Sequence, residues 1–204
     1  MKLEAHEVVL VVGVRGTGKT HWAQREIVTD ARRVVVWDPY GEYPCRESCT
    51  LDELCADSAR LDREALSLAV VPSWRTPTDL CAEFETFADV APTIPGGTVL
   101  VIDECRLLRG ASELLIFMAT QSRHWGDGVP LVLIAQRAVG VPPDARDQVS
   151  RVVSFRQSSP KDIAALVEQC GDAAQRVKSL PRFEFFAWDE SQAFEETNTA
   201  GQAG

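Results

Sequence analysis

Residues 13–20 read Gly-Val-Arg-Gly-Thr-Gly-Lys-Thr and directly follow the apolar run 8–12. In a loop of this spacing the backbone N–H groups surround the phosphates of a nucleotide, the lysine reaches the terminal phosphates, and the threonine hydroxyl holds Mg²⁺. The sequence therefore predicts binding of ATP and Mg²⁺, with Lys19 also acting on the reacting phosphate. The residues expected to contact the nucleotide are Gly13, Arg15, Gly16, Thr17, Gly18, Lys19, Thr20 and His21.

Two consecutive carboxylates, Asp103 and Glu104, end the apolar run 98–102. Ligands of parallel sheets bind at the carboxyl ends of the strands, and successive strand residues point to opposite faces, so the two acids should have separate roles. Asp103 suits Mg²⁺, through water or together with Thr20, and Glu104 suits activation of the water that attacks the γ-phosphate. The alternative is a solvated strand end, which the phosphate loop makes less favourable.

Further polar residues follow two other apolar runs. Gln136 ends the run 131–135 and is expected to hydrogen-bond the γ-phosphate or the attacking water, unless backbone groups satisfy its amide. Asp38 follows the run 33–37, and we expect it beside the nucleotide together with Glu42, unless the segment is a simple Pro-Tyr-Gly turn. His21 lies near the phosphates or the base, or else on the helix surface.

These groups can act together only if strands bring them to one edge of a sheet, and the chain has the pattern of such strands. Short β-branched runs alternate with helical segments, which is typical of parallel strands and crossover helices. We expect strands at 7–12, 33–37, 66–71, 99–103, 131–136, 151–155 and 183–188. We expect helices at 18–30, 78–88, 112–124, 160–170 and 172–179. The segment 39–63 is the least regular.

Composition is that of one α/β domain. We expect this domain over 1–189 and a flexible tail over 190–204. The net charge of −9 disfavours a broad basic face for nucleic acid, and no apolar stretch approaches the length of a membrane span. We expect a cytoplasmic protein. The six cysteines form no Cys-x-x-Cys pair, which favours reduced thiols over a zinc site.

The order of these motifs resembles the HerA/FtsK superfamily of DNA-pumping ATPases. Beside the phosphate loop and the paired acids, it includes Asp-Pro-Tyr-Gly-Glu-Tyr at 38–43, Ser-Arg-His-Trp-Gly at 122–126, Leu-Ile-Ala-Gln-Arg at 133–137 and Phe-Arg-Gln-Ser-Ser-Pro-Lys-Asp at 155–162. The match covers 8–188. Many ATPases share the loop and the acids, whereas the segments at 38–43, 133–137 and 155–162 are more particular. Relatives usually have threonine before the strand-end glutamine, where this chain has Ala135.

The resemblance implies a RecA-like P-loop NTPase of the additional-strand, catalytic-glutamate class, with a mainly parallel sheet flanked by helices on both faces. It implies a homo-oligomeric ring, typically a hexamer, that moves double-stranded DNA independently of sequence. In its small size the chain resembles the genome-packaging ATPases of tectivirus-like and turreted archaeal viruses. That likeness implies capsid or membrane-vertex partners and a location in the host cytoplasm or at the virion vertex.

Such a motor needs arginines for the transition state and for DNA. A guanidinium often reaches the γ-phosphate from a neighbouring subunit, and Arg123, which matches the Gly-Arg or Ser-Arg position of the relatives, is the first candidate. Other candidates, each of which could instead form a surface ion pair, are Arg137, Arg146 and Arg156. The segment 106–110, with two arginines and a terminal glycine, is a candidate for contacts to DNA phosphates, unless it is a solvated loop.

Two other functions stay open at this point. A small nucleotide kinase would use the same phosphate loop but seldom has the acid pair, so Glu104 argues against it. A non-hydrolysing assembly protein would bind ATP to shape a ring, and the intact Lys19, Thr20, Asp103 and Glu104 argue against that.

Overall fold

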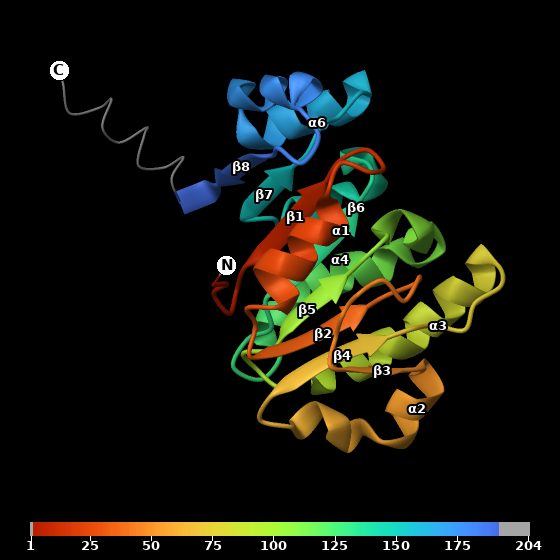
Figure 1. Cartoon of the computed structure of the whole chain (residues 1–204). Helices are drawn as coiled ribbons and strands as arrows, with labels where there is room; N and C mark the ends of the chain where they lie inside the picture. The colour runs from red at the N-terminus through yellow and green to blue at the C-terminus, as the bar shows by residue number, and fades with distance from the viewer. Residues whose placement is uncertain (1, 192–204) are drawn as a thin grey trace.

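The computed structural model describes residues 2–191, and a single eight-stranded sheet runs through the middle of this part of the chain (Figure 1). The strand order is β3-β4-β2-β5-β6-β1-β7-β8, with β1 to β7 parallel and β8 antiparallel to β7. The strands are β1 (Val8–Val12), β2 (Arg33–Trp37), β3 (Glu47–Cys49), β4 (Leu66–Val70), β5 (Val99–Ile102), β6 (Leu131–Ala135), β7 (Arg151–Ser154) and β8 (Phe186–Asp189). The expected mainly parallel sheet is confirmed.

Helices cover both faces of this sheet, which explains why its central strands are apolar without alternation. All five residues of β1 are buried: Val9 and Val11 belong to one apolar cluster, and Val8, Leu10 and Val12 belong to another. On the face of Val9 the cover is α1 (Lys19–Ala23), which continues directly into a π-helical segment, Gln24–Val28. The other face is covered by α2 (Leu51–Ala56), α3 (Pro77–Val90), α4 (Ser112–Gln121), α5 (Pro143–Arg146) and α6 (Pro160–Cys170).

The irregular segment 39–63 contains a short strand and a helix that the expected element list lacks. Strand β3 adds to the sheet edge beside β4. Helix α2 begins with a capping box, in which the Thr50 hydroxyl accepts from the Glu53 backbone N–H and the Glu53 carboxylate accepts from the Thr50 N–H. The Thr-x-x-Glu signal was present in the sequence, but the helix has only six residues and too little periodicity to stand out.

Four expected elements differ from the structure in helix type or in a boundary. The helix expected over 18–30 changes from α to π geometry at Gln24. The helix expected over 112–124 ends in a separate 3-10 turn, Ser122–His124, and the segment Asp172–Ser179 is 3-10 throughout. The last strand begins at Phe186 instead of residue 183, because residues 182 and 183 contact the phosphate loop. Of the tail expected over 190–204, residues 192–204 lie outside the described part.

The topology decides which strand ends meet. Strand β6 lies between β1 and β5, so Gln136, directly after β6, is placed between the phosphate loop after β1 and the paired acids after β5. Strand β2 flanks β5 on its other side, which brings the segment after Trp37 to the same acids. No helix among residues 2–191 is long and apolar enough to cross a membrane.

Candidate nucleotide-binding site

Glycines are required at fixed places in the loop that follows β1. Gly16 and Gly18 have φ values of 77° and 114°, in the left-handed region that other residues adopt only under strain. At Gly13 the constraint is space, since an added Cβ would lie 2.5 Å from the Phe155 Cβ. The loop therefore bends tightly enough to point its N–H groups at one volume of space.

Lys19 holds its charged group against the loop. Its side chain is buried, with 8 % of the residue exposed, and its Nζ donates a hydrogen bond of 3.4 Å to the Val14 carbonyl oxygen. Burial lowers the pKa of Lys19, and the charges of Glu104 and Asp103 oppose that shift. The ammonium group thus folds back on its own loop, in a long hydrogen bond that a phosphate oxygen can replace.

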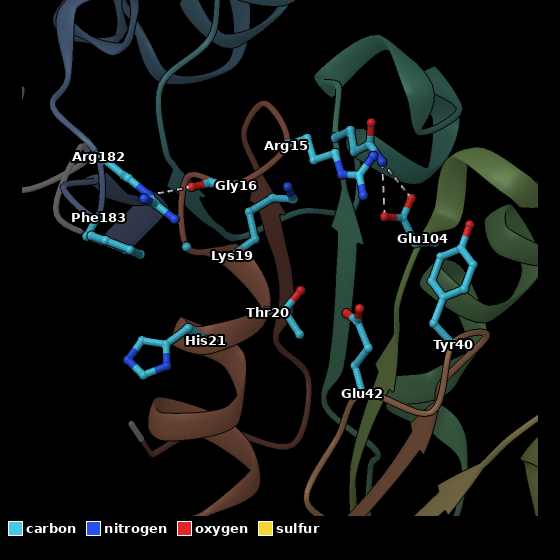
Figure 2. A pocket seen from close by; sticks show the side chains of 12 residues that line it. Arg15, Gly16, Lys19, Thr20, His21, Tyr40, Glu42, Glu104, Arg182 and Phe183 are labelled. Carbon is cyan, nitrogen blue, oxygen red and sulfur yellow. Dashed lines mark hydrogen bonds between the residues drawn. The ribbon is translucent and has the colours of Figure 1, made fainter.

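A pocket of about 600 Å³ opens beside the loop (Figure 2). Most of the predicted nucleotide-contacting residues line it, and so do three of the four predicted catalytic residues, Lys19, Glu104 and Gln136. The lining consists of Arg15, Gly16, Gly18, Lys19, Thr20, His21, Tyr40, Glu42, Glu104, Gln136, Arg182 and Phe183. In Figure 2 Glu104 and Tyr40 lie on one side of Lys19, and Arg182 and Phe183 lie on the other.

Two predicted contact residues of the loop, Gly13 and Thr17, do not line the pocket. Thr17 is buried, and its Oγ1 donates a hydrogen bond of 2.8 Å to the Val14 carbonyl. Gly13 lies against Thr17 and Phe155. The Thr17 hydroxyl and the close packing of Phe155 against Gly13 maintain the shape of the loop from behind, so only the backbone of these two residues is available to a phosphate.

Glu104 and Gln136 form a pair at the pocket wall. The Gln136 Nε2 donates to both carboxylate oxygens of Glu104, at 3.1 and 3.3 Å (Figure 2). Glu104 has φ 52°, an uncommon backbone conformation for a residue other than glycine, asparagine or aspartate. The turn redirects the chain right after the strand, so the Glu104 carboxylate reaches the pocket while Asp103 stays buried behind it.

Asp103 is held in place by groups that the sequence did not connect with it. Its Oδ2 accepts a hydrogen bond of 2.8 Å from the Tyr43 hydroxyl, and its Oδ1 accepts one of 2.7 Å from the Glu104 backbone N–H. Tyr43 is buried, and desolvation together with the Asp103 charge raises its pKa well above 10. The phenol is therefore a permanent donor, and it fixes the orientation of the Asp103 carboxylate.

Asp38 does not line the pocket, in contrast to the expected place beside the nucleotide. Only 1 % of the residue is exposed, and its carboxylate accepts hydrogen bonds from the backbone N–H groups of Glu42 and Tyr43, at 3.1 and 2.9 Å. These bonds bend the segment after β2 so that Glu42 reaches the pocket and Tyr43 reaches Asp103. Asp38 thus positions other residues of the site.

The predicted metal ligands fit Mg²⁺ and no ion that needs a protein cage. Among residues 2–191 no group of three or more histidine, cysteine, aspartate or glutamate side chains could hold a metal ion. Mg²⁺ typically uses one or two protein oxygens together with water and substrate phosphates. The Thr20 hydroxyl at the pocket wall and the buried Asp103 carboxylate match that donor set.

We expect Asp103 to make the stability of the metal-free protein depend on pH. Desolvation raises the pKa of Asp103 from 3.8 to about 6, so its stabilising contribution is complete below about pH 4 and is lost as the pH rises through 6. Asp103→Asn should therefore reduce the decline in unfolding free energy between pH 5 and pH 8 by roughly 1 kcal/mol. Urea denaturation at both pH values measures this difference. Asp89→Asn, at an exposed carboxylate of α3, is the matched control, and an unchanged decline in Asp103→Asn would contradict the pKa assignment.

Arg123 lies far from the pocket of its own subunit. It belongs to the turn Ser122–His124, and the carbonyl of Ser122 accepts from the backbone N–H of Val129, just before β6 begins. The pocket lies at the opposite end of β6, and a strand of five residues separates the two edges by roughly 16 Å. A role for Arg123 at a γ-phosphate therefore requires the pocket of a neighbouring subunit.

The alternative arginines differ in their availability. The guanidinium of Arg137 donates to the buried Asp162 carboxylate at 2.9 Å and to the Ser159 hydroxyl at 3.1 Å. Arg137 therefore forms an ion pair, which was the alternative to a role at the γ-phosphate. Arg156 is exposed, and the Nε of Arg146 is buried without a hydrogen-bond partner among the described residues.

Sequence reasoning missed Tyr43, Arg182 and Phe183. The Arg182 Nε donates a hydrogen bond of 3.0 Å to the Gly16 carbonyl, a contact between residues 166 positions apart (Figure 2). No local sequence pattern indicates a contact between residues so far apart in the chain. Tyr43 did carry a signal, because the Asp-Pro-Tyr-Gly-Glu-Tyr segment was noted, but its contact with Asp103 depends on the pairing of β2 with β5.

Solved structures with the same fold exist, although no protein-family model and no curated protein sequence matches the chain. The genome-packaging NTPase B204 of Sulfolobus turreted icosahedral virus 2, in complex with ATP-gammaS, superposes with a TM-score of 0.68 at 18 % identity over 93 % of this chain and 95 % of that one. B204 of Sulfolobus turreted icosahedral virus, a DNA-packaging ATPase, gives 0.64 at 19 % identity, with 93 % and 95 % covered.

A more distant neighbour is the conjugation coupling protein TcpA of pCW3, with a TM-score of 0.54 and 13 % identity. The match covers 90 % of this chain but only 57 % of TcpA. The chain therefore has the RecA-like P-loop NTPase fold that its resemblance to the HerA/FtsK superfamily implied, and the viral genome-packaging NTPases share this fold over nearly their whole length.

Proposed function

We propose that this protein is a HerA/FtsK-type motor that hydrolyses ATP to move double-stranded DNA, and that it packages a viral genome. The observation that carries the proposal is the Glu104–Gln136 pair in the same pocket as Lys19 and the phosphate loop. A nucleotide kinase needs no general base at that strand end, and a binding protein that does not hydrolyse ATP needs none at all.

In the proposed reaction the phosphates enter between the loop and Glu104. Lys19 exchanges its long bond to the Val14 carbonyl for phosphate oxygens. Glu104 accepts a proton from the attacking water, whose oxygen bonds to the γ-phosphorus while the bond to the bridging oxygen breaks, and ADP and phosphate leave. Thr20 and Asp103 would hold Mg²⁺, which neutralises charge on the phosphates.

Gln136 supports a link between nucleotide state and catalysis. Its amide donates to Glu104, and from its place between β1 and β5 the same amide can turn to a γ-phosphate or to the attacking water. Glu104 is then free to take the proton. Because ADP has no γ-phosphate, a glutamine with these two possible partners distinguishes ATP from ADP. Ala135 lacks the hydroxyl that the threonine of the relatives has, so this role falls to Gln136.

The proposed DNA contact is the segment that follows Glu104 directly. Arg106 and Arg109 line a second pocket, of about 830 Å³, which adjoins the nucleotide pocket because Tyr40, Glu104 and Gln136 line both. Phosphate contacts of arginines are independent of sequence, as a packaging motor requires. A movement of Glu104 on hydrolysis would be transmitted to these arginines along a few residues of backbone.

The proposed assembly is a homo-oligomeric ring, with a hexamer as the expected form. The far edge of the sheet carries Arg123, and in a head-to-tail ring this edge can face the pocket of the next subunit. The likeness in fold and extent to viral packaging NTPases supports capsid or membrane-vertex proteins as further partners, and the host cytoplasm or the virion vertex as the location.

Double-stranded DNA is expected to accelerate ATP turnover several-fold in a manner that falls with salt, because the contacts are to phosphates. Phosphate release at constant protein concentration, with and without duplex DNA of random sequence, measures the effect. Arg106→Ala combined with Arg109→Ala should abolish the acceleration while the rate without DNA is retained. A rate that DNA leaves unchanged and that a nucleoside monophosphate raises would favour a kinase instead.

A further inference from the structure

We infer that the loop 181–185 and helix α1 together build the subsite for the base of the nucleotide, and that this subsite holds a purine ring by stacking. The inference rests on the proposed nucleotide site and adds to it the part of the substrate that the phosphate loop does not recognise. It assigns binding of the base to residues that follow the 3-10 segment Asp172–Ser179, far along the chain from the phosphate loop.

A second, smaller cavity continues the phosphate pocket on the side away from Glu104. Its volume is about 240 Å³, and Gly18, His21 and Phe183 line both cavities. The remaining lining residues are Trp22, Arg25, Phe155 and Phe185. A nucleotide whose phosphates lie at Lys19 can therefore extend its ribose and base past Gly18 into a space with four aromatic side chains.

The loop that closes this space is attached to the phosphate loop itself. The Arg182 Nε donates to the Gly16 carbonyl at 3.0 Å, and the Phe183 backbone N–H donates to the Thr17 carbonyl at 3.1 Å. Phe183 has φ 69°, a strained conformation for an aromatic residue. These attachments position the Phe183 ring so closely over Gly18 that a Cβ there would lie 2.8 Å from its Cδ1.

Two of the four aromatic rings are largely exposed to solvent, so a ligand can cover them. Phe183 is 57 % exposed, with the Arg182 guanidinium 4.6 Å from its ring centroid, and Phe185 is 42 % exposed. Phe185 packs against Phe155 and Trp22, with centroid distances of 5.7 and 6.3 Å. Together the rings make an apolar wall with one open side, which is the surface that a flat base covers by stacking.

The apolar wall selects a flat ring by its shape, and the polar edge of the bound base stays exposed to solvent. The polar side chains in the lining are those of His21 and Arg25, and both residues are exposed. Strong discrimination between bases requires buried polar groups that the wrong base would leave unpaired. We therefore expect ADP and GDP to bind with Kd values within about fivefold of each other, since stacking tolerates different bases. A hundredfold preference would overturn recognition by stacking.

Phe183→Ala tests the subsite directly. We expect the Kd of ADP to rise about tenfold, because one stacking face is lost, while the Kd of inorganic tripolyphosphate, which has no base, stays unchanged. Phe183→Tyr should restore the affinity for ADP. The matched control is Phe117→Ala, which removes an exposed aromatic ring on α4, outside the lining of both cavities. Isothermal titration calorimetry measures each Kd.

Trp22 supplies a second readout that does not depend on catalysis. ADP should change the tryptophan fluorescence of the native protein, tripolyphosphate should not, and Trp22→Phe, which keeps an aromatic ring, should abolish the change. If ADP binds equally well to Phe183→Ala and native protein, the base subsite is wrong and the phosphate site stands. If native protein binds neither ADP nor tripolyphosphate, the proposed nucleotide site itself is wrong.

Discussion

Glu104→Gln is expected to bind ATP with unchanged affinity and to hydrolyse it about a thousandfold more slowly, because the amide cannot accept the proton of the attacking water. Glutamine keeps the length and shape of the side chain, so the turn at φ 52° and the contact with Gln136 can persist. Single-turnover phosphate release and ATP titration separate the two properties. The effect should be the largest of any single carboxylate change in the chain.

Glu113→Gln, at an exposed carboxylate in the first turn of α4, controls for the loss of one negative charge. Turnover of Glu104→Gln at the native rate would contradict the assignment of the base. The same variant tests the ring: mixed with Arg123→Ala subunits, it should regain part of the turnover, because one interface then joins an intact Glu104 to an intact Arg123. No recovery in mixed rings would remove Arg123 from the site.

Lys19→Ala is expected to weaken ATP binding roughly 100-fold, because each charge-assisted hydrogen bond to a phosphate contributes 1.5–3 kcal/mol, about that factor at the upper end. Lys19 is buried at the pocket wall, where its ammonium faces both Glu104 and Asp103. Its removal also leaves the two carboxylates without a neighbouring cation, and their charge then repels the phosphates of ATP. Titration of ATP measured by calorimetry gives the change in Kd.

Lys161→Ala, in the first turn of α6 and exposed, is the control for Lys19→Ala. Both variants lose one lysine, and only the first is expected to lose ATP affinity. Equal ATP affinity of Lys19→Ala and native protein would show that the loop does not bind the phosphates. That outcome would also remove the basis for the base subsite.

Features carried by short, local patterns could be predicted from the sequence. The phosphate loop is local because its glycines are needed within six residues, at 13, 16 and 18, for reasons of φ angle and space. The apolar runs of β1, β5 and β6 are local because each strand is buried on both faces. Their order along the chain indicated the parallel sheet and the edge at which the polar residues meet.

The individual contacts between distant segments could not be predicted. Asp38, expected beside the nucleotide, does not line the pocket, because its carboxylate is buried and accepts hydrogen bonds from two backbone N–H groups. The strand expected from residue 183 starts later because Arg182 and Phe183 bind the phosphate loop. No periodicity or propensity at 181–185 encodes a partner at 16 and 17.

The amino-acid order by itself determined which groups are available for chemistry: a glycine-rich loop that ends in Lys19 and Thr20, the paired acids Asp103 and Glu104, and the strand-end amide of Gln136, each recognisable within a few residues. Tertiary structure alone decided their neighbours. Insertion of β6 between β1 and β5 put Gln136 onto Glu104, pairing of β2 with β5 put Tyr43 onto Asp103, and the return of the chain after residue 180 put an aromatic wall beside Gly18. The physical reason is that hydrogen bonds and ring contacts need proximity in space, and a sheet creates that proximity through the order of its strands, which no local stretch of sequence contains.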